Sequence, residues 1–291
     1  WKEPLRRKNS LSFVHLMNRR MGEVNKTKIE WVKGSNGELG YTWNPVTGCR
    51  HKCKDQYCYA AKIAKRFGVD AFLGKETIVI DAPVEVSKNE EGPYRVNPYP
   101  ALFRPTCHRY RLDEPQKLKK PSKIFVVSMG DLFGEWVPDE WIAEVFKACE
   151  AAPQHTYMFL TKNPKRYLEL QFKIPLPTAH KYWYGSTANC FDDFKLGNRA
   201  HYLSDLTGVK KFLSIEPLLG DIGEIGLANL YRYDWVIIGQ QTGPGAKPPK
   251  YEWVQSIIGQ CRAEAVPVFV KPPLYEKFPI QQWPEGMSCR S

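Results

Sequence analysis

The sequence predicts an α/β fold built as a (β/α) barrel of the TIM type, complete or partial. After Gly40, short β-rich runs alternate with amphipathic helix patterns, and polar residues follow the ends of the runs. This alternation is typical of parallel strands joined by covering helices. A chain of 291 residues with 43% hydrophobic content can bury such a core. A doubly wound open sheet is the alternative architecture.

Eight β-rich runs are the predicted strands, and eight strands over about 230 residues suit this barrel. The runs are Thr42–Thr47, Thr77–Ile80, Lys123–Val127, Thr156–Leu160, Tyr182–Tyr184, Lys211–Ser214, Trp235–Ile238 and Val266–Val270. Amphipathic patterns between them predict helices, one of which is opened by Pro138. These helices are Tyr59–Phe67, Asp139–Ala152, Pro164–Leu170, Asp192–Leu206 and Tyr251–Ala263.

The barrel is expected to span residues 29–271. Residues 87–121 are rich in Pro, Lys and aromatic residues without a clear period, which predicts an irregular insertion rather than a separate domain. Residues 272–291 contain three X-Pro pairs and are expected to run over the surface as a C-terminal wrap.

The net charge of +11 favours a polyanionic partner, and we expect nucleic acid, above all DNA. Residues 1–28 hold eight Lys and Arg against two Glu, a net +6, which leaves +5 for the rest of the chain. This basic N-terminal arm either holds phosphates non-specifically or is a solvated leader.

No run of 18 apolar residues occurs, so we expect a cytoplasmic protein without a membrane partner. The oligomeric state stays open. Clustered cysteines in such a protein indicate metal binding or catalysis rather than disulfides.

Cys49, Cys53 and Cys58 follow the first predicted strand within ten residues. Thiolates this close together call for a metal that neutralises them. A closed structural zinc site uses four protein ligands, whereas three leave one coordination position open for chemistry. The other five cysteines are scattered, and we expect them to be structural.

Polar residues follow six consecutive predicted strands, where a (β/α) barrel gathers its chemistry. Together they predict a pocket. Its candidate residues are Ser128, Asp131, Thr161, Lys162, Ser186, Asn189, Glu216 and Gln240. Glycines after residue 238 allow close approach of a ligand but lack the dinucleotide-binding spacing.

The three-cysteine loop, with Tyr57 directly before Cys58, resembles the cluster-binding loop of radical S-adenosylmethionine (radical SAM) enzymes. Further segments resemble a group of phage and prophage proteins that is related to these enzymes and mostly lacks an assigned reaction. The likeness runs from about Lys28 to Lys271. Its segments are Trp43–Cys49, Ile124–Phe133, Leu160–Pro164, Leu213–Gly220, Trp235–Gly239 and Thr242–Ala246.

The resemblance implies a [4Fe–4S] cluster on Cys49, Cys53 and Cys58, with one iron open to S-adenosylmethionine (SAM). An external electron donor of the flavodoxin or ferredoxin type would drive cleavage of SAM to methionine and a 5′-deoxyadenosyl radical, which abstracts hydrogen from the substrate. The resemblance also implies roles: Tyr57, or the backbone around Cys58, along the adenine, and Ser128 and Asp131 at the methionine amino group. Residues expected toward ribose, carboxylate or substrate are Thr161, Lys162, Ser186, Asn189 and Glu216, and Gln240 is a further candidate for cofactor binding.

Two features depart from the family pattern. The cysteine spacing is three residues and then four, whereas three and then two is usual. The extra residues either loop out or alter the cluster geometry. Gln240 and Gln241 stand where relatives carry Gly-Glu, which indicates a different substrate contact.

The favoured function is a radical SAM enzyme that modifies a nucleic-acid base, for example by rearranging a modified thymine of phage DNA in the host cytoplasm. Aromatic side chains such as Trp31, Trp43, Trp136 and Trp183 would stack on an extruded base. One alternative is a radical SAM enzyme acting on a small molecule or peptide. Another is a zinc-stabilised, non-enzymatic nucleic-acid-binding protein, with His51, Cys107 or His108 as fourth ligand.

Overall fold

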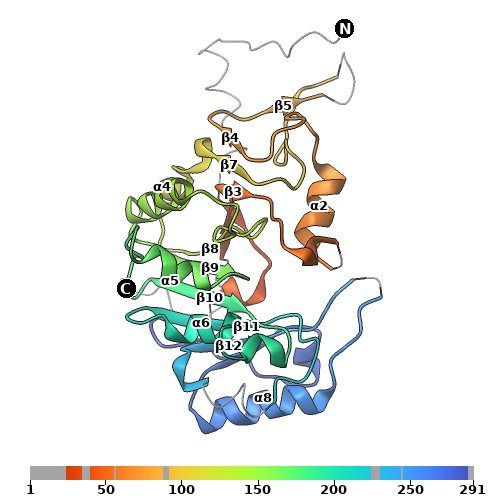
Figure 1. The fold of residues 1–291 in the computed structure, drawn as a ribbon, viewed down its shortest axis with the longest axis vertical. Coiled ribbons are helices and arrows are strands. Elements are labelled where there is room, and N and C mark those ends of the chain that lie inside the picture. The colour runs from red at the N-terminus through yellow and green to blue at the C-terminus, as the bar shows by residue number, and fades with distance from the viewer. Residues whose placement is uncertain are drawn as a thin grey trace.

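The protein is built on one large, mostly parallel sheet, seen in a computed structural model that describes residues 24–34, 40–55, 57–87, 92–223, 230–243 and 245–287 (Figure 1). The sheet order is β1-β2-β8-β9-β10-β11-β12-β13, and only the β1–β2 pair is antiparallel. The strands are β1 (Asn25–Lys26), β2 (Tyr41–Trp43), β8 (Lys123–Val126), β9 (Thr156–Thr161), β10 (Tyr182–Thr187), β11 (Lys210–Ile215), β12 (Trp235–Ile238) and β13 (Val268–Val270).

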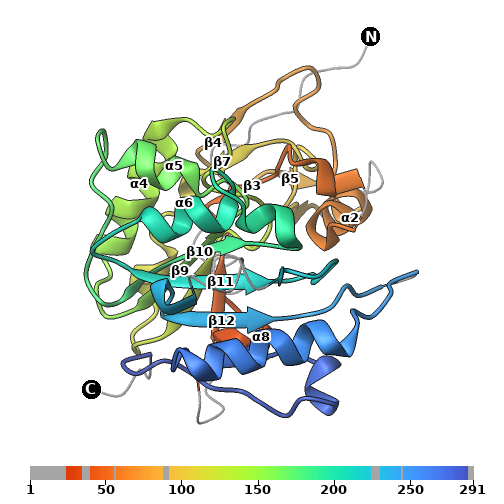
Figure 2. The same cartoon turned by 60° about the horizontal axis from the view of Figure 1, so that its bottom comes forward.

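The parallel strands follow one another in chain order, as in a (β/α) barrel, and not in the reversing order of a doubly wound sheet. Four helices cover one face of the sheet (Figures 1 and 2). They are α4 (Asp139–Glu150), α5 (Lys165–Leu170), α6 (Arg199–Asp205) and α8 (Tyr251–Ala263).

The sheet is open in the part of the chain that the structure describes, so of the two expected forms, complete and partial, the complete barrel is not seen. Both outer edges are already paired. β1 occupies the edge of β2, and the chain after β13 returns along that strand, where Val270 N donates to Ile280 O at 2.8 Å and Gln282 N donates to Val268 O at 2.9 Å. These hydrogen bonds use backbone N–H and C=O groups of the edge strands that closure of a barrel would need.

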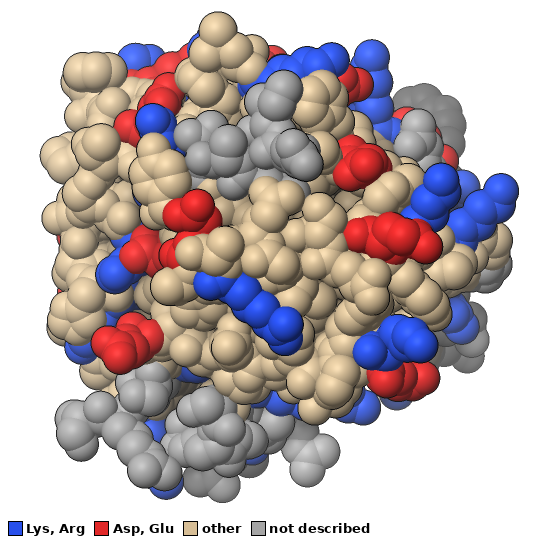
Figure 3. Space-filling model, turned by 90° about the horizontal axis from the view of Figure 1, so that it is seen from below, with Lys and Arg blue, Asp and Glu red and all other residues tan. Residues whose placement is uncertain are grey.

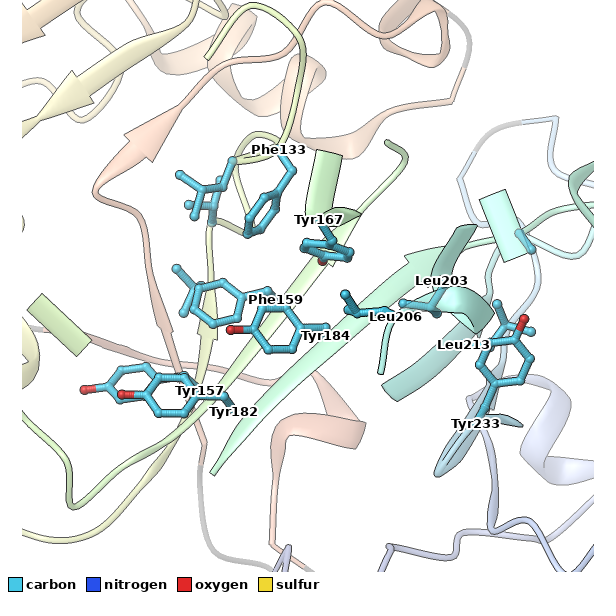
Figure 4. Close-up of a cluster of buried hydrophobic side chains, with 14 of the residues drawn as sticks. Phe133, Tyr157, Phe159, Tyr167, Tyr182, Tyr184, Leu203, Leu206, Leu213 and Tyr233 are labelled. Carbon is cyan, nitrogen blue, oxygen red and sulfur yellow. The ribbon is translucent and has the colours of Figure 1, made fainter. Parts of the chain in front are cut away.

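Alternate side chains of the strands form two separate cores. Toward the helices, Phe159 stacks on Tyr184 with ring centroids 5.5 Å apart, and Tyr167 packs edge-on against Tyr184 (Figure 4). The opposite face buries its own aromatic layer under a 3-10 turn, η1 (Glu30–Val32). That layer includes Trp31, Phe125, Met158, Trp183, Phe212, Trp235 and Phe269.

Three tryptophans that the sequence offered for stacking on bases are core residues. Trp31, Trp43 and Trp183 are at most 2% exposed. A ring with no exposed face cannot stack on a nucleotide, so this expectation is wrong for all three. Trp136 is half-buried and packs edge-on against His51, with centroids 4.9 Å apart.

Two predicted strands differ from the observed ones. Thr42–Thr47 is divided into β2 and β3 (Val46–Thr47), because Pro45 has no N–H with which to continue the ladder. The second predicted strand becomes β4 (Ile78–Ile80), which lies outside the main sheet and pairs with β7 (Thr106–His108). β3 pairs with the other edge of β7, so this three-stranded sheet lies directly behind the cysteine loop.

Short elements occur among the described residues of the predicted insertion and just before it. β5 (Glu85–Val86) and β6 (Arg95–Val96) pair as a short ribbon, and η3 (Arg109–Arg111) and α3 (Glu114–Lys117) follow β7. The end of the predicted basic arm belongs to the sheet as β1, whereas residues 1–23 lie outside the described residues.

Among the helices, α2 (Tyr59–Phe67) and α8 have the predicted bounds. The helix predicted over residues 192–206 is divided into η4 (Phe191–Phe194) and α6, because Gly197 has φ +76° between them. Within the described residues, no helix has the length and apolar character needed to span a membrane. The remaining 3-10 turns are η2 (Lys52–Asp55), η5 (Leu230–Arg232) and η6 (Leu274–Glu276).

Candidate metal centre and strand-end site

The cysteine loop begins at Gly48, a position that only glycine can fill. Its φ is +88°, and a Cβ there would lie 2.2 Å from Arg104 O. Gly48 N donates to Met129 O at 2.9 Å, and Cys49 N donates to Phe103 O at 3.2 Å. The backbone at the first thiol is therefore fixed between the loop after β8 and the inserted segment.

The second and third cysteines are joined by a closed turn. Cys53 lies in η2, and its carbonyl accepts from both Tyr57 N and Cys58 N at 3.2 Å. The helix α2 starts at Tyr59, directly after the third cysteine. These two hydrogen bonds join the backbone of Tyr57 and Cys58 to that of Cys53.

The thiols of Cys49 and Cys53 lie in surroundings that favour the neutral form. Cys49 is 8% exposed, and burial raises its pKa well above the ordinary value, with a further increase from the Asp131 carboxylate. Burial also raises the pKa of Cys53, which the Lys162 ammonium opposes. A thiol with a raised pKa is a poor nucleophile. Thiol catalysis is therefore disfavoured, whereas a bound metal deprotonates coordinating thiols.

A single ion and a cluster place different requirements on three thiols of one loop. Within the described ranges, no three His, Cys, Asp or Glu side chains converge as one metal ion would require. In an iron–sulfur cluster each thiolate binds a different iron, so three thiols on one loop need not converge on one point. Of the fourth zinc ligands considered from the sequence, His51 pairs with Asp131 through Nε2, His108 pairs with Thr47, and Cys107 lies in the main core.

Asp131 connects the cysteine loop to the ends of β8 and β9. Its carboxylate is 4% exposed and has four partners. Oδ1 accepts from Thr161 Oγ1 at 2.7 Å and Phe133 N at 3.0 Å. Oδ2 accepts from Lys162 N at 2.9 Å and lies 2.8 Å from His51 Nε2. The carboxylate is saturated, so Asp131 acts here as a positioning residue.

Ser128 follows β8 and lies beside Tyr59, the first residue of α2. Its hydroxyl is 3.2 Å from Asn44 Oδ1, which also accepts from Met129 N at 2.9 Å. Its carbonyl accepts from Tyr59 Oη at 2.6 Å. The structure therefore brings Ser128, as predicted, beside the loop that carries Cys58.

Asn189, after β10, is 5% exposed and fully engaged. Its Nδ2 donates to Pro217 O at 2.7 Å, its backbone N donates to Asp193 at 2.6 Å, and its Oδ1 accepts from Arg199 at 3.2 Å. Arg199 also pairs with Asp193 at 3.1 Å. Asn189 thus holds the ends of β10 and β11 together.

Arg199 is a site residue that the sequence reasoning missed. Its guanidinium acts on the Cys53 thiol in the same direction as Lys162, lowering a pKa that burial raises. Arg199 is the first residue of α6, where the helix dipole disfavours a cation. A basic residue at a helix start, against its local preference, is the signal that could have identified it.

Glu216 and Lys271, after β11 and β13, form a separate group. Their side chains make an ion pair and are 27% and 16% exposed. Gly239 leaves room for this pair, because a Cβ there would lie 2.9 Å from Glu216 Cδ. Gln240 follows and is half-buried.

Two predicted residues are placed differently. Ser186 is completely buried, and its hydroxyl lies 3.5 Å from Thr187 O, so it does not face a ligand. Tyr57 is half-buried beside the cysteines, and its pKa is raised by burial and then by Cys53. The cysteine loop therefore gathers Tyr57, Ser128, Asp131, Thr161 and Lys162, while Glu216 belongs to the other group.

Comparison with known proteins gives one family and one similar structure. No curated protein matches the chain. A structure described as "Spore photoproduct lyase complexed with dinucleoside spore photoproduct" matches with 11% identity and a TM-score of 0.48, over 87% of this chain and 79% of that one. Residues 26–273 match the family described as "Protein of unknown function (DUF5131)", a range close to that of the sequence resemblance. The chain is therefore a member of the DUF5131 family.

Proposed function

We propose that this protein is a radical SAM enzyme that holds a [4Fe–4S] cluster on Cys49, Cys53 and Cys58. The observation that carries the proposal is the loop itself: three thiols, with its backbone fixed by hydrogen bonds at both ends of the run. When bound, the cluster would supply the electron that cleaves SAM and so provide a 5′-deoxyadenosyl radical.

The surrounding residues have distinct roles in this proposal. Asp131 holds the cysteine loop through His51 and holds the end of β9 through Thr161. The Lys162 ammonium makes no hydrogen bond within the described residues and lies in the electrostatic range of Cys53, so it is available to an anionic group such as a carboxylate.

We further infer that the substrate is a nucleic-acid base, within DNA, and that an external flavodoxin or ferredoxin reduces the protein. The charge of +11 supports a polyanionic substrate. The Glu216–Lys271 pair offers one acceptor and one donor side by side, as the polar edge of a base requires. The resemblance to phage proteins favours phage DNA.

The test is metal analysis after anaerobic reconstitution with iron and sulfide. We expect about four iron ions and four sulfides per chain, with a brown chromophore. Cys53→Ala should lose the chromophore. Cys261→Ala is the matched control, because Cys261 is also buried but lies in α8. One zinc and no iron, or an intact chromophore in Cys53→Ala, would contradict the proposal.

A further inference from the structure

The helix α2 turns most of its surface toward solvent. Of its nine residues only Ala60 and Ala64 are buried. Its buried side chains are therefore two alanines, while Ile63 is half-buried and the other long side chains of the helix are exposed. Both ribbon views place α2 on the opposite side of the molecule from α4 (Figures 1 and 2).

The exposed side of α2 carries cations without carboxylates. Lys62, Lys65 and Arg66 are exposed, and the helix contains no acidic residue. Their spacing of three and four residues places them on one side of the helix. None of the three takes part in an ion pair among the described residues, whereas the neighbouring Arg50 and Arg104 pair with Glu76 and Asp70.

The face seen from below mixes the two signs of charge (Figure 3). In the view from below, Lys and Arg alternate with Asp and Glu across the face (Figure 3). Ion pairs such as Lys195–Asp192 and Lys210–Asp234 neutralise cations elsewhere. The unpaired cations on α2 are therefore a local concentration of positive charge, next to the candidate metal centre.

Exposed aromatic rings lie at both ends of this helix. Tyr59 is 54% exposed and Phe67 is 57% exposed. Tyr59 directly follows Cys58, and its hydroxyl is anchored on Ser128 O at 2.6 Å, so the ring has a fixed position. Cations combined with exposed aromatic faces are the arrangement by which proteins hold single-stranded nucleic acid.

We propose that the α2 face binds the sugar–phosphate backbone of the nucleic acid, with a base against Tyr59 at the entrance to the cysteine loop. This inference rests on the proposed function, because only a catalytic cysteine loop would need a base beside it. Binding of the nucleic acid to α2 does not itself require the cluster. Lysine binds phosphates as a point charge and arginine binds them through its planar guanidinium, so all three cations suit a sugar–phosphate backbone.

The test is binding of a fluorescein-labelled 20-nucleotide single-stranded DNA to the full-length, reconstituted protein, followed by anisotropy over a series of salt concentrations. Two triple variants lose the same charge on opposite sides of the molecule. They are K62A/K65A/R66A in α2 and, as matched control, K119A/K120A/K147A, all exposed residues of the α3–α4 side.

The α2 variant should bind roughly tenfold or more weakly at low salt, and its slope of log K against log salt should be shallower by about 2, since each lost phosphate contact removes about 0.7. The control should change less than twofold. Tyr59→Leu should weaken binding several-fold without changing the slope, because stacking is insensitive to salt.

Equal weakening in both triple variants, or no DNA binding by the unchanged protein, would overturn the proposal. So would an α2 surface that binds an acidic flavodoxin but not the oligonucleotide. Iron measured in the same samples separates the two ideas. Iron without DNA binding refutes the docking surface and the DNA substrate but not the cluster-bearing enzyme, whereas DNA binding without iron refutes the cluster but not the docking surface.

Discussion

Two carboxylates at the strand ends, Asp131 and Glu216, differ in how much of their bonding capacity the fold uses. Asp131 is 4% exposed and has four partners from three segments of the chain. Glu216 has a 27% exposed side chain and, within the described ranges, pairs with Lys271 alone. The first carboxylate is consumed in positioning the cysteine loop. The second retains acceptor sites, so it is the better candidate for contact with a ligand.

The largest effect should come from Asp131→Asn. The amide keeps one acceptor oxygen but turns an NH2 group toward donors, so the free energy of unfolding should fall by about 3 kcal/mol, because each bond to the charged group contributes about 1.5–3 kcal/mol. Urea denaturation measures this loss. Asp113→Asn is the control: this surface carboxylate pairs with Lys117 at 2.8 Å and should change stability by less than about 1 kcal/mol. Equal losses of stability in the two variants would contradict the positioning role of Asp131.

A third carboxylate, Glu114, is buried without a hydrogen-bond donor among the described residues. It is 6% exposed, and burial raises its pKa from 4.5 to about 7, against the opposing charges of Arg111 and Lys117. The folded state therefore holds this proton more tightly than the unfolded state. The resulting stability is present below pH 4.5 and is lost as the pH rises through about 7.

This loss should reach roughly 3 kcal/mol, and Glu114→Gln should remove it. Urea denaturation between about pH 5 and pH 8 measures the difference between the two proteins. Parallel pH profiles for both would show that Glu114 is solvated in the folded state. It would also mean that the number of hydrogen-bond partners does not determine how much each of these carboxylates affects stability.

The smallest effect on stability should come from Glu216→Gln. A half-exposed ion pair contributes about 1 kcal/mol or less, so unfolding should change little. Formation of 5′-deoxyadenosine in the presence of DNA should fall about tenfold or more, as expected when a ligand loses a bond to a charged group. If Glu216→Gln lost as much stability as Asp131→Asn and formed the same amount of product, Glu216 would be a structural residue and not a ligand contact.

Much of this fold could be predicted from local patterns, because α2, α4 and α8 carry clear helical periods and the buried strands are short apolar runs. The open sheet could not, since it depends on the pairing of residues 280–282 with β13, which no local pattern encodes. The same holds for β4, whose run is as apolar as a barrel strand but whose partner is β7.

The candidate site was predicted in part. Ser128, Asp131, Thr161 and Lys162 could be identified because strand ends meet at one edge of a sheet. Arg199 could not be found in this way, because it belongs to a helix start and reaches the site through Asn189 and Asp193. Ser186 follows the same pattern as its neighbours but is buried, since strand position alone does not specify which face its side chain takes.

The most direct test of the central claim is formation of 5′-deoxyadenosine from SAM by the reduced, reconstituted protein, with Cys53→Ala as the paired control. We predict that the unchanged protein forms 5′-deoxyadenosine, that single-stranded DNA stimulates its formation, and that Cys53→Ala forms none. An iron-loaded, reduced protein that leaves SAM intact, or equal product from Cys53→Ala, would contradict the account.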